Sequence, residues 1–227
     1  MKRAFADRLT ENASLVPGQL ITFVLTGIWL LVALTAKSQE VKTIGTQHWS
    51  TQNLDVATFR NGDTIPEART DEQWQRANQQ RTPAWCYYDN NPANGALYGR
   101  MYNWYAVADP RELAPAGWHI PGKTEWTILA NQLGTIYRAG KSMKSIRGWQ
   151  NDGNGDNTSG FNGLPGGDRS PDGKFIHLGM HSFWSSTTEY DADGIWDYGL
   201  HYSDNELSEK YGNNKGHGFY IRCIKDR

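Results

Sequence analysis

The chain has 227 residues, a formal net charge of −1 at pH 7 and 12% aromatic residues. This length suits one domain of ordinary size, and the near-zero charge leaves no basic excess with which to bind nucleic acid or an anionic membrane. The aromatic content argues against disorder, because disordered chains are poor in such residues. We therefore predict one aromatic-cored globular domain, with no nucleic-acid partner and no membrane partner beyond its N-terminal segment.

An apolar run of 17 residues, 20–36, lies near the start of the chain and follows three basic residues. Small side chains at Ala36 and Ser38 match the pattern of a signal-peptidase site. We expect a signal peptide at residues 1–38, a single domain at 39–227, and a protein that is secreted or on the outer cell surface. The run is also just long enough to remain as an uncleaved membrane anchor, and this alternative stays open.

In the first half of the expected domain, the sequence predicts short strands, turns and one helix. Residues 41–49 are rich in β-formers and indicate a first strand, and Asn61 with Gly62 between two extended runs is a strong hairpin signal. Thr70 fits the N-cap of one short helical turn. The other elements expected here are a strand at 85–88, a turn-rich loop at 89–95 and a short helix at 102–108.

The second half predicts another helix and three strands. Trp126, Leu129, Ala130 and Leu133 fall on one face of a helix, and Gly134 follows where a C-cap belongs. The other elements expected here are a long ordered loop at 149–168 and strands at 183–187, 195–202 and 218–224. Two short helices among short antiparallel strands and long ordered loops indicate the α+β class.

A long polar segment, 203–216, lies between the last two expected strands. It carries Tyr211, Asn205, Asn213 and Asn214, and tyrosine combined with asparagine is typical of adaptable recognition surfaces. We take these four residues as the candidate site for a glycan or protein ligand. A merely solvated loop is the alternative interpretation.

Two patterns could concern metals. Asp152, Asn154 and Asp156 alternate in a glycine-rich loop, as oxygen ligands do in the first half of a calcium loop, although the second half of an EF-hand is missing. We expect no cofactor beyond a structural calcium ion at this loop, and a solvated turn is the favoured alternative to that ion. His177 and His181 lie four apart in a region of strand and turn, where this spacing does not put both rings on one face, so zinc is disfavoured.

Cys86 and Cys223 are the only cysteines, and both fall in the part that we expect to be exported. A pair of cysteines outside the cytoplasm is normally oxidised. We therefore expect one disulfide, which would close nearly the whole domain.

Six sequence phrases resemble the Fibrobacter succinogenes major paralogous domain, and they occur in the order typical of that family. They are YGRMYNWYAV at 98–107, PAGWHIP at 115–121, EW at 125–126, GF with LPGG at 160–167, FWSST at 183–187 and GFYIRC at 218–223. The resemblance covers roughly residues 41–225. The helix start and the closing strand are further similar to the formylglycine-generating-enzyme branch of the C-type lectin-like fold, which implies a lectin-like topology.

The chain departs from this family at two positions. Ala114 stands where the family often has a cysteine, which leaves Cys86 as the available partner of Cys223. Gly122 stands where the family usually has a serine or threonine helix cap. The oxidase relatives carry a cysteine at the position of Cys223 and use reactive thiols with copper, but with one other cysteine present a structural disulfide is favoured.

Members of the family are typically secreted or surface-exposed bacterial proteins whose biochemical activity is not established. The sequence has no Gly-x-Ser-x-Gly motif, phosphate loop or dinucleotide fingerprint, so no catalytic residue is assigned. We expect an exported, non-catalytic binding or adhesion module that recognises a glycan or protein ligand through its loops. The alternatives are a secreted enzyme acting on glycans or protein cysteines, and a structural subunit of an outer-surface complex.

Overall fold

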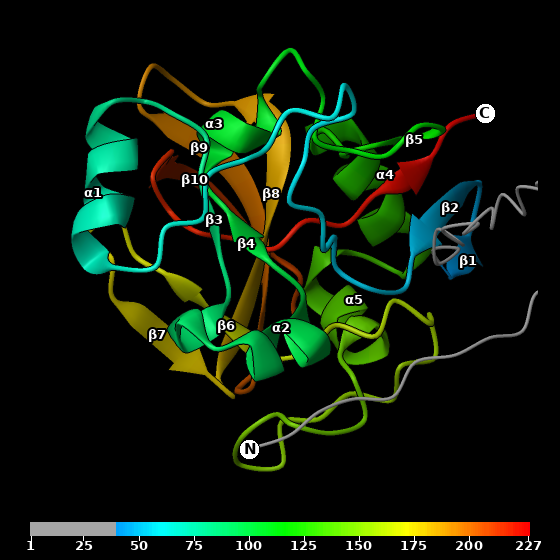
Figure 1. Cartoon of the computed structure of the whole chain (residues 1–227). Helices are drawn as coiled ribbons and strands as arrows, with labels where there is room; N and C mark the ends of the chain where they lie inside the picture. Colours follow the sequence, from blue (N-terminus) through cyan, green and yellow to red (C-terminus); the bar gives the residue numbers. More distant parts are fainter. Residues whose placement is uncertain (1–39) are drawn as a thin grey trace, which may run out of the picture. The chain divides into compact units, whose positions relative to one another are not determined.

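The computed structural model describes residues 40–227, so the predicted signal peptide at 1–38 lies outside the described residues. Three sheets and five α-helices make up the described part (Figure 1). This mixed architecture is compatible with the predicted α+β class, while the C-type lectin-like topology stays a prediction. None of the helices within residues 40–227 combines the length and apolar character needed to cross a membrane.

The largest sheet has five strands in the order β10, β9, β8, β6 and β7. Their bounds are β6 Gly166–Arg169, β7 Phe175–Leu178, β8 His181–Glu189, β9 Gly194–His201 and β10 Ser208–Asn214. β8, β9 and β10 form two consecutive antiparallel pairs, but β6 runs parallel to β8. The expectation of antiparallel strands throughout is therefore wrong for this pair.

The two smaller sheets have four and two strands, and the four-stranded sheet joins the two ends of the domain. A four-stranded sheet contains β1 Val41–Ile44, β2 Gln47–Ser50, β11 Ile224–Lys225 and β5 Trp118–His119, in that order. β3 Trp85–Cys86 pairs with β4 Met101–Tyr102. Because β11 lies between β2 and β5, the C-terminal strand holds the N-terminal hairpin against the middle of the chain.

Residues 40–227 contain five α-helices, where the sequence predicts two. They are α1 Asp71–Gln79, α2 Pro92–Tyr98, α3 Trp104–Val107, α4 Lys123–Gln132 and α5 Ile136–Met143, with a 3-10 turn at Tyr88–Asn90. α1 extends beyond its predicted single turn because Thr70 Oγ1 caps it by accepting from Gln73 N, and because the buried ring of Trp74 anchors an otherwise polar helix. α2 arises in a segment dense in turn formers because Asn91 caps it and Pro92 occupies its first turn.

Gly140 explains how α5 fits against the rest of the domain. Its N–H donates to Asn205 O at 2.9 Å, and a Cβ added at this position would lie 2.4 Å from Glu206 O. Only glycine therefore allows the helix to approach the turn between β9 and β10 so closely. Such a long-range contact leaves no local signal, and this is why the sequence did not predict α5.

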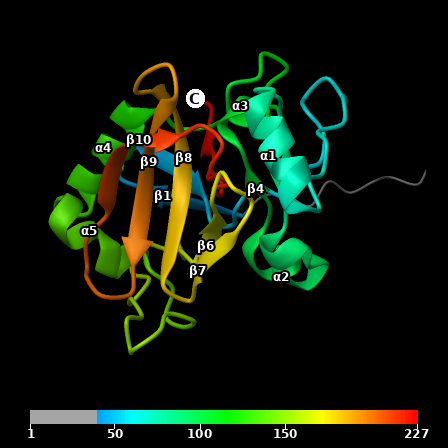
Figure 2. The ribbon, with the colours of Figure 1, turned by 90° about the vertical axis from the view of Figure 1, so that its left-hand side faces the viewer.

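β10 replaces most of the polar loop expected at 203–216. It forms because β9 offers it a ladder from Ser208 opposite Gly199 to Asn214 opposite Gly194, interrupted by a register shift at Gly212. Its side chains are mostly polar because it lies at the edge of the sheet, where charged residues protect against association. Figure 2 shows β10 at that edge, with α4 and α5 beside it.

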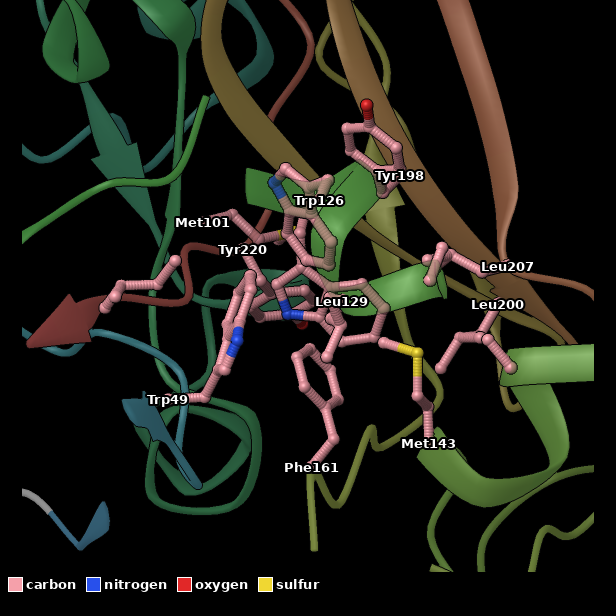
Figure 3. Packing of buried hydrophobic residues seen from close by; sticks show 14 of the residues in the cluster. Trp49, Met101, Trp126, Leu129, Met143, Phe161, Tyr198, Leu200, Leu207 and Tyr220 are labelled. Carbon is pink, nitrogen blue, oxygen red and sulfur yellow. The ribbon is translucent and has the colours of Figure 1, made fainter. Parts of the chain in front are cut away.

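The core is aromatic, as predicted. Trp126 of α4 stacks on Tyr198 of β9 with ring centroids 4.7 Å apart, and it also lies 4.9 Å from the ring of Trp49. Phe161, from the long loop after α5, packs edge-on against Trp184 of β8 at 5.2 Å. Figure 3 shows the rings of Trp49, Trp126, Phe161 and Tyr198 among Leu and Met side chains, which include Leu129 of α4, Met143 of α5 and Leu200 of β9. The long loop is thus anchored by an aromatic residue, as expected for 149–168.

Candidate functional site

Three aromatic side chains, which we call the aromatic platform, lie together beside the edge of the five-stranded sheet. They are Tyr190, Trp196 and Tyr211. Ring centroids are 5.3 Å apart for Trp196 and Tyr211, 5.1 Å for Tyr190 and Tyr211, and 5.9 Å for Tyr190 and Trp196. Tyr211 is 63% exposed and Tyr190 is 48% exposed, whereas Trp196 is half-buried between them. The three rings therefore form one aromatic group that is partly exposed to solvent.

Backbone pairing holds the platform in place. Trp196 and Tyr211 are directly opposite each other in the β9–β10 ladder, so their side chains share one face of the sheet. Tyr190 reaches them from the turn after β8, where its N–H donates to Gly194 O at 2.9 Å. Asp191 Oδ1 accepts from Gly194 N at 2.7 Å and closes the same turn. The rings are therefore preorganised.

One charged pair borders the platform. Lys123 Nζ lies 3.1 Å from the centroid of the Trp196 ring, in a cation–π arrangement, and 3.4 Å from Glu209 Oε1. Lys123 begins α4, and Glu209 is in β10. The platform thus combines apolar ring faces with a donor and an acceptor at its margin.

The four residues predicted to bind ligand do not form one site. Tyr211 belongs to the platform, but Asn213 Nδ2 donates to Asp197 Oδ1 at 2.8 Å, on a buried carboxyl group. Asn214 Oδ1 accepts from Gly216 N at 2.8 Å and caps a turn. Asn205 lies at the far end of the β9–β10 hairpin. Because most of this segment is the strand β10 and not a loop, the four residues lie on different faces of the sheet and at different ends of the β9–β10 hairpin.

A polar hollow of about 430 Å³ lies at that far end, and we call it the polar basin. Its walls come from α5, the loop after it, and the turn between β9 and β10. They comprise Lys141, Lys144, Asn151, Asp152, Gly153, Asn154, Tyr202, Ser203, Asp204 and Asn205. In Figure 2 the two loops concerned lie at the same end of the five-stranded sheet.

The basin contains two of the three predicted calcium ligands. Asp152 and Asn154 line it, but Asn154 Oδ1 already accepts from Trp149 N at 3.0 Å. Asp156 is not part of the wall, and its Oδ1 accepts from both N and Oγ1 of Thr158. Within residues 40–227 no group of three or more His, Cys, Asp or Glu side chains is arranged to hold a metal ion. Calcium binding here stays a prediction.

Comparison with known families agrees with the sequence phrases. The model of the Fibrobacter succinogenes major domain matches residues 42–225, which is most of the chain. The chain belongs to the Fibrobacter succinogenes major domain family. Neither the curated proteins nor the solved structures contain a match. The family resemblance predicted from the sequence is therefore confirmed, and it carries no assigned activity with it.

The Fibrobacter succinogenes major domain phrases serve packing and connection in this structure. In PAGWHIP, His119 Nδ1 is hydrogen-bonded to Asp226 Oδ1 and His119 Nε2 to Glu125 Oε1, each at 2.7 Å. Glu125 Oε2 accepts from Gly122 N at 2.9 Å, which completes the start of α4 without a hydroxyl cap. Burial lowers the pKa of His119, but the hydrogen bonds with Asp226 and Glu125 outweigh this and raise it above its ordinary value.

Sequence reasoning missed a row of histidines on the five-stranded sheet. Four of the six histidines contribute to it: the rings of His177 and His181 are 4.4 Å apart, and those of His181 and His201 are 4.3 Å apart. His177 Nδ1 is 2.7 Å from Asp168 Oδ1, and His217 Nδ1 is 3.9 Å from Asp168 Oδ2. The row joins titratable groups from β6, β7, β8 and β9.

The expectation that His177 and His181 would not share a face is wrong. A tight turn joins β7 to β8, closed by Met180 N, which donates to His177 O at 2.9 Å. The turn brings the two rings together although each belongs to a different strand. Burial, together with the neighbouring His201 and His177, lowers the pKa of His181 to about 4.

Both cysteines are free and buried. Cys86 belongs to the main aromatic cluster and Cys223 to a second cluster around Tyr102 and Ile221, so the predicted disulfide is not formed in the structure. Burial raises the pKa of each thiol to about 12. Neither sulfur therefore has the exposure or the thiolate character that redox chemistry requires.

Proposed function

We propose that the protein is an exported, non-catalytic binding module that recognises a glycan on its aromatic platform. The exposed, mutually packed rings of Tyr190, Trp196 and Tyr211 are the observation that supports this function. A sugar ring has an apolar face of C–H groups that packs on an aromatic ring, and hydroxyl groups at its edge that need hydrogen-bond partners. Tyrosine and tryptophan satisfy both needs because they combine a large apolar surface with a polar tip.

The charged margin of the platform supports a sugar better than a purely apolar partner. Lys123 offers N–H donors and Glu209 offers acceptor oxygens beside the Trp196 ring. A sugar hydroxyl both donates and accepts, so it can use both side chains. An apolar protein surface would instead leave both charges desolvated, which costs free energy.

Preorganisation also favours a binding role. The platform residues are held by a β ladder and by a closed turn, so little side-chain freedom is lost when a ligand packs on them. Exposed tyrosines on a loop without a binding role would not require a ladder and a closed turn to hold them. The location outside the cytoplasm is part of the proposal and follows from the apolar N-terminal segment.

An enzyme acting on protein cysteines is the less favoured alternative. Its chemistry requires reactive thiols, whereas Cys86 and Cys223 are both completely buried and burial raises the pKa of each to about 12. An enzyme acting on glycans is addressed by the same experiment that tests binding, because turnover of the bound glycan can be measured in parallel.

A glycan array followed by calorimetry on the full-length protein tests the proposal. We expect saturable binding of at least one glycan, weakened about tenfold by Tyr211→Ala and by Trp196→Ala, because each loses one stacked ring. Tyr137→Ala is the matched control, since Tyr137 is 65% exposed but lies on α5 outside the platform. Its affinity should equal that of the unmodified protein.

Three results would contradict the proposal. The first is full affinity in the Tyr211→Ala variant with an unchanged melting temperature. The second is chemical conversion of the bound glycan, which would establish an enzyme. The third is a protein ligand that binds the platform in a pull-down while no glycan does.

A further inference from the structure

Lys144, the C-cap residue directly after α5, is a buried cation at the polar basin. It is only 2% exposed, and its Nζ donates to His201 O at 3.1 Å and to Asp204 O at 2.6 Å. Both acceptors are uncharged backbone carbonyls, and within residues 40–227 the lysine forms no ion pair. Burying a charge without a counter-ion is costly, so this lysine requires an explanation.

Its surroundings show that the charge is only partly compensated. Burial lowers the pKa of Lys144, and only the more distant charge of Asp204 raises it. The Trp149 ring lies 5.6 Å from Nζ and adds a weak cation–π contribution. Lys141, one turn earlier on α5, lines the same basin and adds a second positive charge.

The basin wall is rigid where it faces these lysines. Gly153 N donates to Gln150 O at 2.9 Å, Gly155 N to Ser145 O at 3.0 Å, and Asp156 N to Lys141 O at 3.0 Å. A Cβ added at Gly153 would lie 2.2 Å from Tyr202 O, so the loop can lie against the end of β9 only with glycine at this position. The hollow is therefore a formed feature of the fold, and its volume of about 430 Å³ falls in the range of small-ligand sites.

The rim offers both hydrogen-bond donors and acceptors. Asn151, Asp152 and Asn205 are exposed side chains on the wall, and Tyr202 adds a half-buried ring. Amide groups donate and accept, and a carboxylate accepts, so together they match hydroxyl groups around a sugar ring. The wall thus carries two lysines, Lys141 and Lys144, and two carboxyl groups, Asp152 and Asp204, among neutral polar groups. The lysines suit a ligand carboxylate, and the other groups suit several ligand hydroxyls.

We propose that the polar basin binds a sugar acid of the hexuronate type, with its carboxylate on Lys144 and Lys141 and its hydroxyls on Asn151, Asp152 and Asn205. The basin lies at the opposite end of the β9–β10 hairpin from the aromatic platform. The two sites are supported by different residues, and the basin does not depend on the proposed function of the platform. A ligand carboxylate supplies the counter-ion that Lys144 lacks in the chain itself.

Titration of the full-length protein with three small probes tests this site. The probes are glucuronate, glucose, which lacks the carboxylate, and acetate, which lacks the ring. Binding is followed by calorimetry and by the backbone amide resonances of Gly153 and Asn205. We expect glucuronate to bind at least tenfold more tightly than either other probe, and to shift both resonances.

Variants locate the binding. Lys144→Met should weaken glucuronate binding tenfold or more. Because Lys144 is buried, this substitution can also affect folding. Lys141→Gln and Asn205→Ala change exposed side chains of the rim and should keep the fold. Each rim variant should weaken binding several-fold. Lys174→Met, an exposed lysine paired with Asp71 far from the basin wall, is the control and should bind as the unmodified protein does.

The outcomes separate this proposal from that for the platform. Equal affinity for glucuronate and glucose, equal affinity for glucuronate and acetate, or unchanged affinity in both rim variants would each overturn it. Loss of binding in Tyr211→Ala with no change in the Gly153 resonance would assign glucuronate to the platform instead, and would also overturn it. If another glycan binds only at the platform, the glucuronate titration still decides whether the basin is a binding site.

Discussion

Arg222 donates from Nε to Asn53 Oδ1 at 2.8 Å, across 169 positions of the chain. The same oxygen accepts from Trp184 Nε1 at 2.9 Å, and the Asn53 amide nitrogen donates to Tyr98 O at 2.7 Å. One asparagine thereby connects the closing strand region, β8 and the end of α2. Arg222 is completely enclosed and packs over the Phe161 ring at 4.5 Å, so the family's closing phrase serves the core.

Asn53→Ala should destabilise the protein by about 3 kcal/mol, because it leaves a buried guanidinium nitrogen and a buried indole N–H without their acceptor. Urea unfolding followed by tryptophan fluorescence measures the change. Asn131→Ala, on the exposed side of α4, is the matched control and should change the free energy of unfolding by less than about 0.5 kcal/mol. Equal effects of the two substitutions would show that the Asn53 connection contributes little.

Local periodicity predicted the parts of the fold that depend on neighbouring residues. Trp126, Leu129 and Ala130 are buried on one face of α4 as their spacing indicated, and Tyr198 and Leu200 of β9 face the aromatic core. Thr70 acts as an N-cap, as expected. In each case the determining interaction lies within one element, and its pattern is visible in the sequence.

Elements set by distant contacts were not predictable in the same way. α5 depends on the approach of Gly140 to Asn205, and β10 depends on the ladder that β9 provides. The same limit applies to the candidate site. Composition identified Tyr211, but Trp196 joins it through cross-strand register and Tyr190 through a turn, and neither relationship can be read from one segment alone.

The cysteines give a test that needs no variant. In the folded protein neither thiol should react with iodoacetamide, because both side chains are buried and burial raises the pKa of each to about 12. Mass spectrometry counts the labels. Rapid labelling of the native protein would contradict the buried placement. Labelling after unfolding without reductant then distinguishes the free thiols of the structure, with two labels, from the disulfide predicted from the sequence, with none.

His119 should make stability depend on pH near neutrality. Its pKa is raised in the folded state, so its contribution is fully present below the unfolded value of about 6.5 and is lost as the pH rises through the folded value. The side chain is 41% exposed, so solvent screening limits the contribution to less than about 1 kcal/mol. The measured quantity is the difference in unfolding free energy between the unmodified protein and His119→Gln at pH 6 and pH 8.

That difference should be larger at pH 6 than at pH 8. Asp226→Asn removes one of the two partners of His119 and should reduce the difference in the same direction. A difference that is independent of pH, or that grows toward pH 8, would show that the hydrogen bonds do not raise the pKa of this histidine.

His217 should lower the stability of the protein at acid pH, whereas His119 stabilises it there. Burial lowers its pKa to about 4, although Asp172 raises it slightly, so the folded protein keeps this ring neutral while the unfolded chain takes up a proton. Stability should therefore decrease as the pH falls from about 6.5 toward 4, by about 2 to 3 kcal/mol for this residue.

His217→Phe removes the titrating group and should flatten that part of the profile of unfolding free energy against pH. Phe59→Leu is the control, because Phe59 is a buried, non-titrating ring of the second hydrophobic cluster, and it should lower stability equally at every pH. If His217→Phe and the unmodified protein lose stability in parallel between pH 6.5 and 4, the acid sensitivity belongs to other groups of the histidine row.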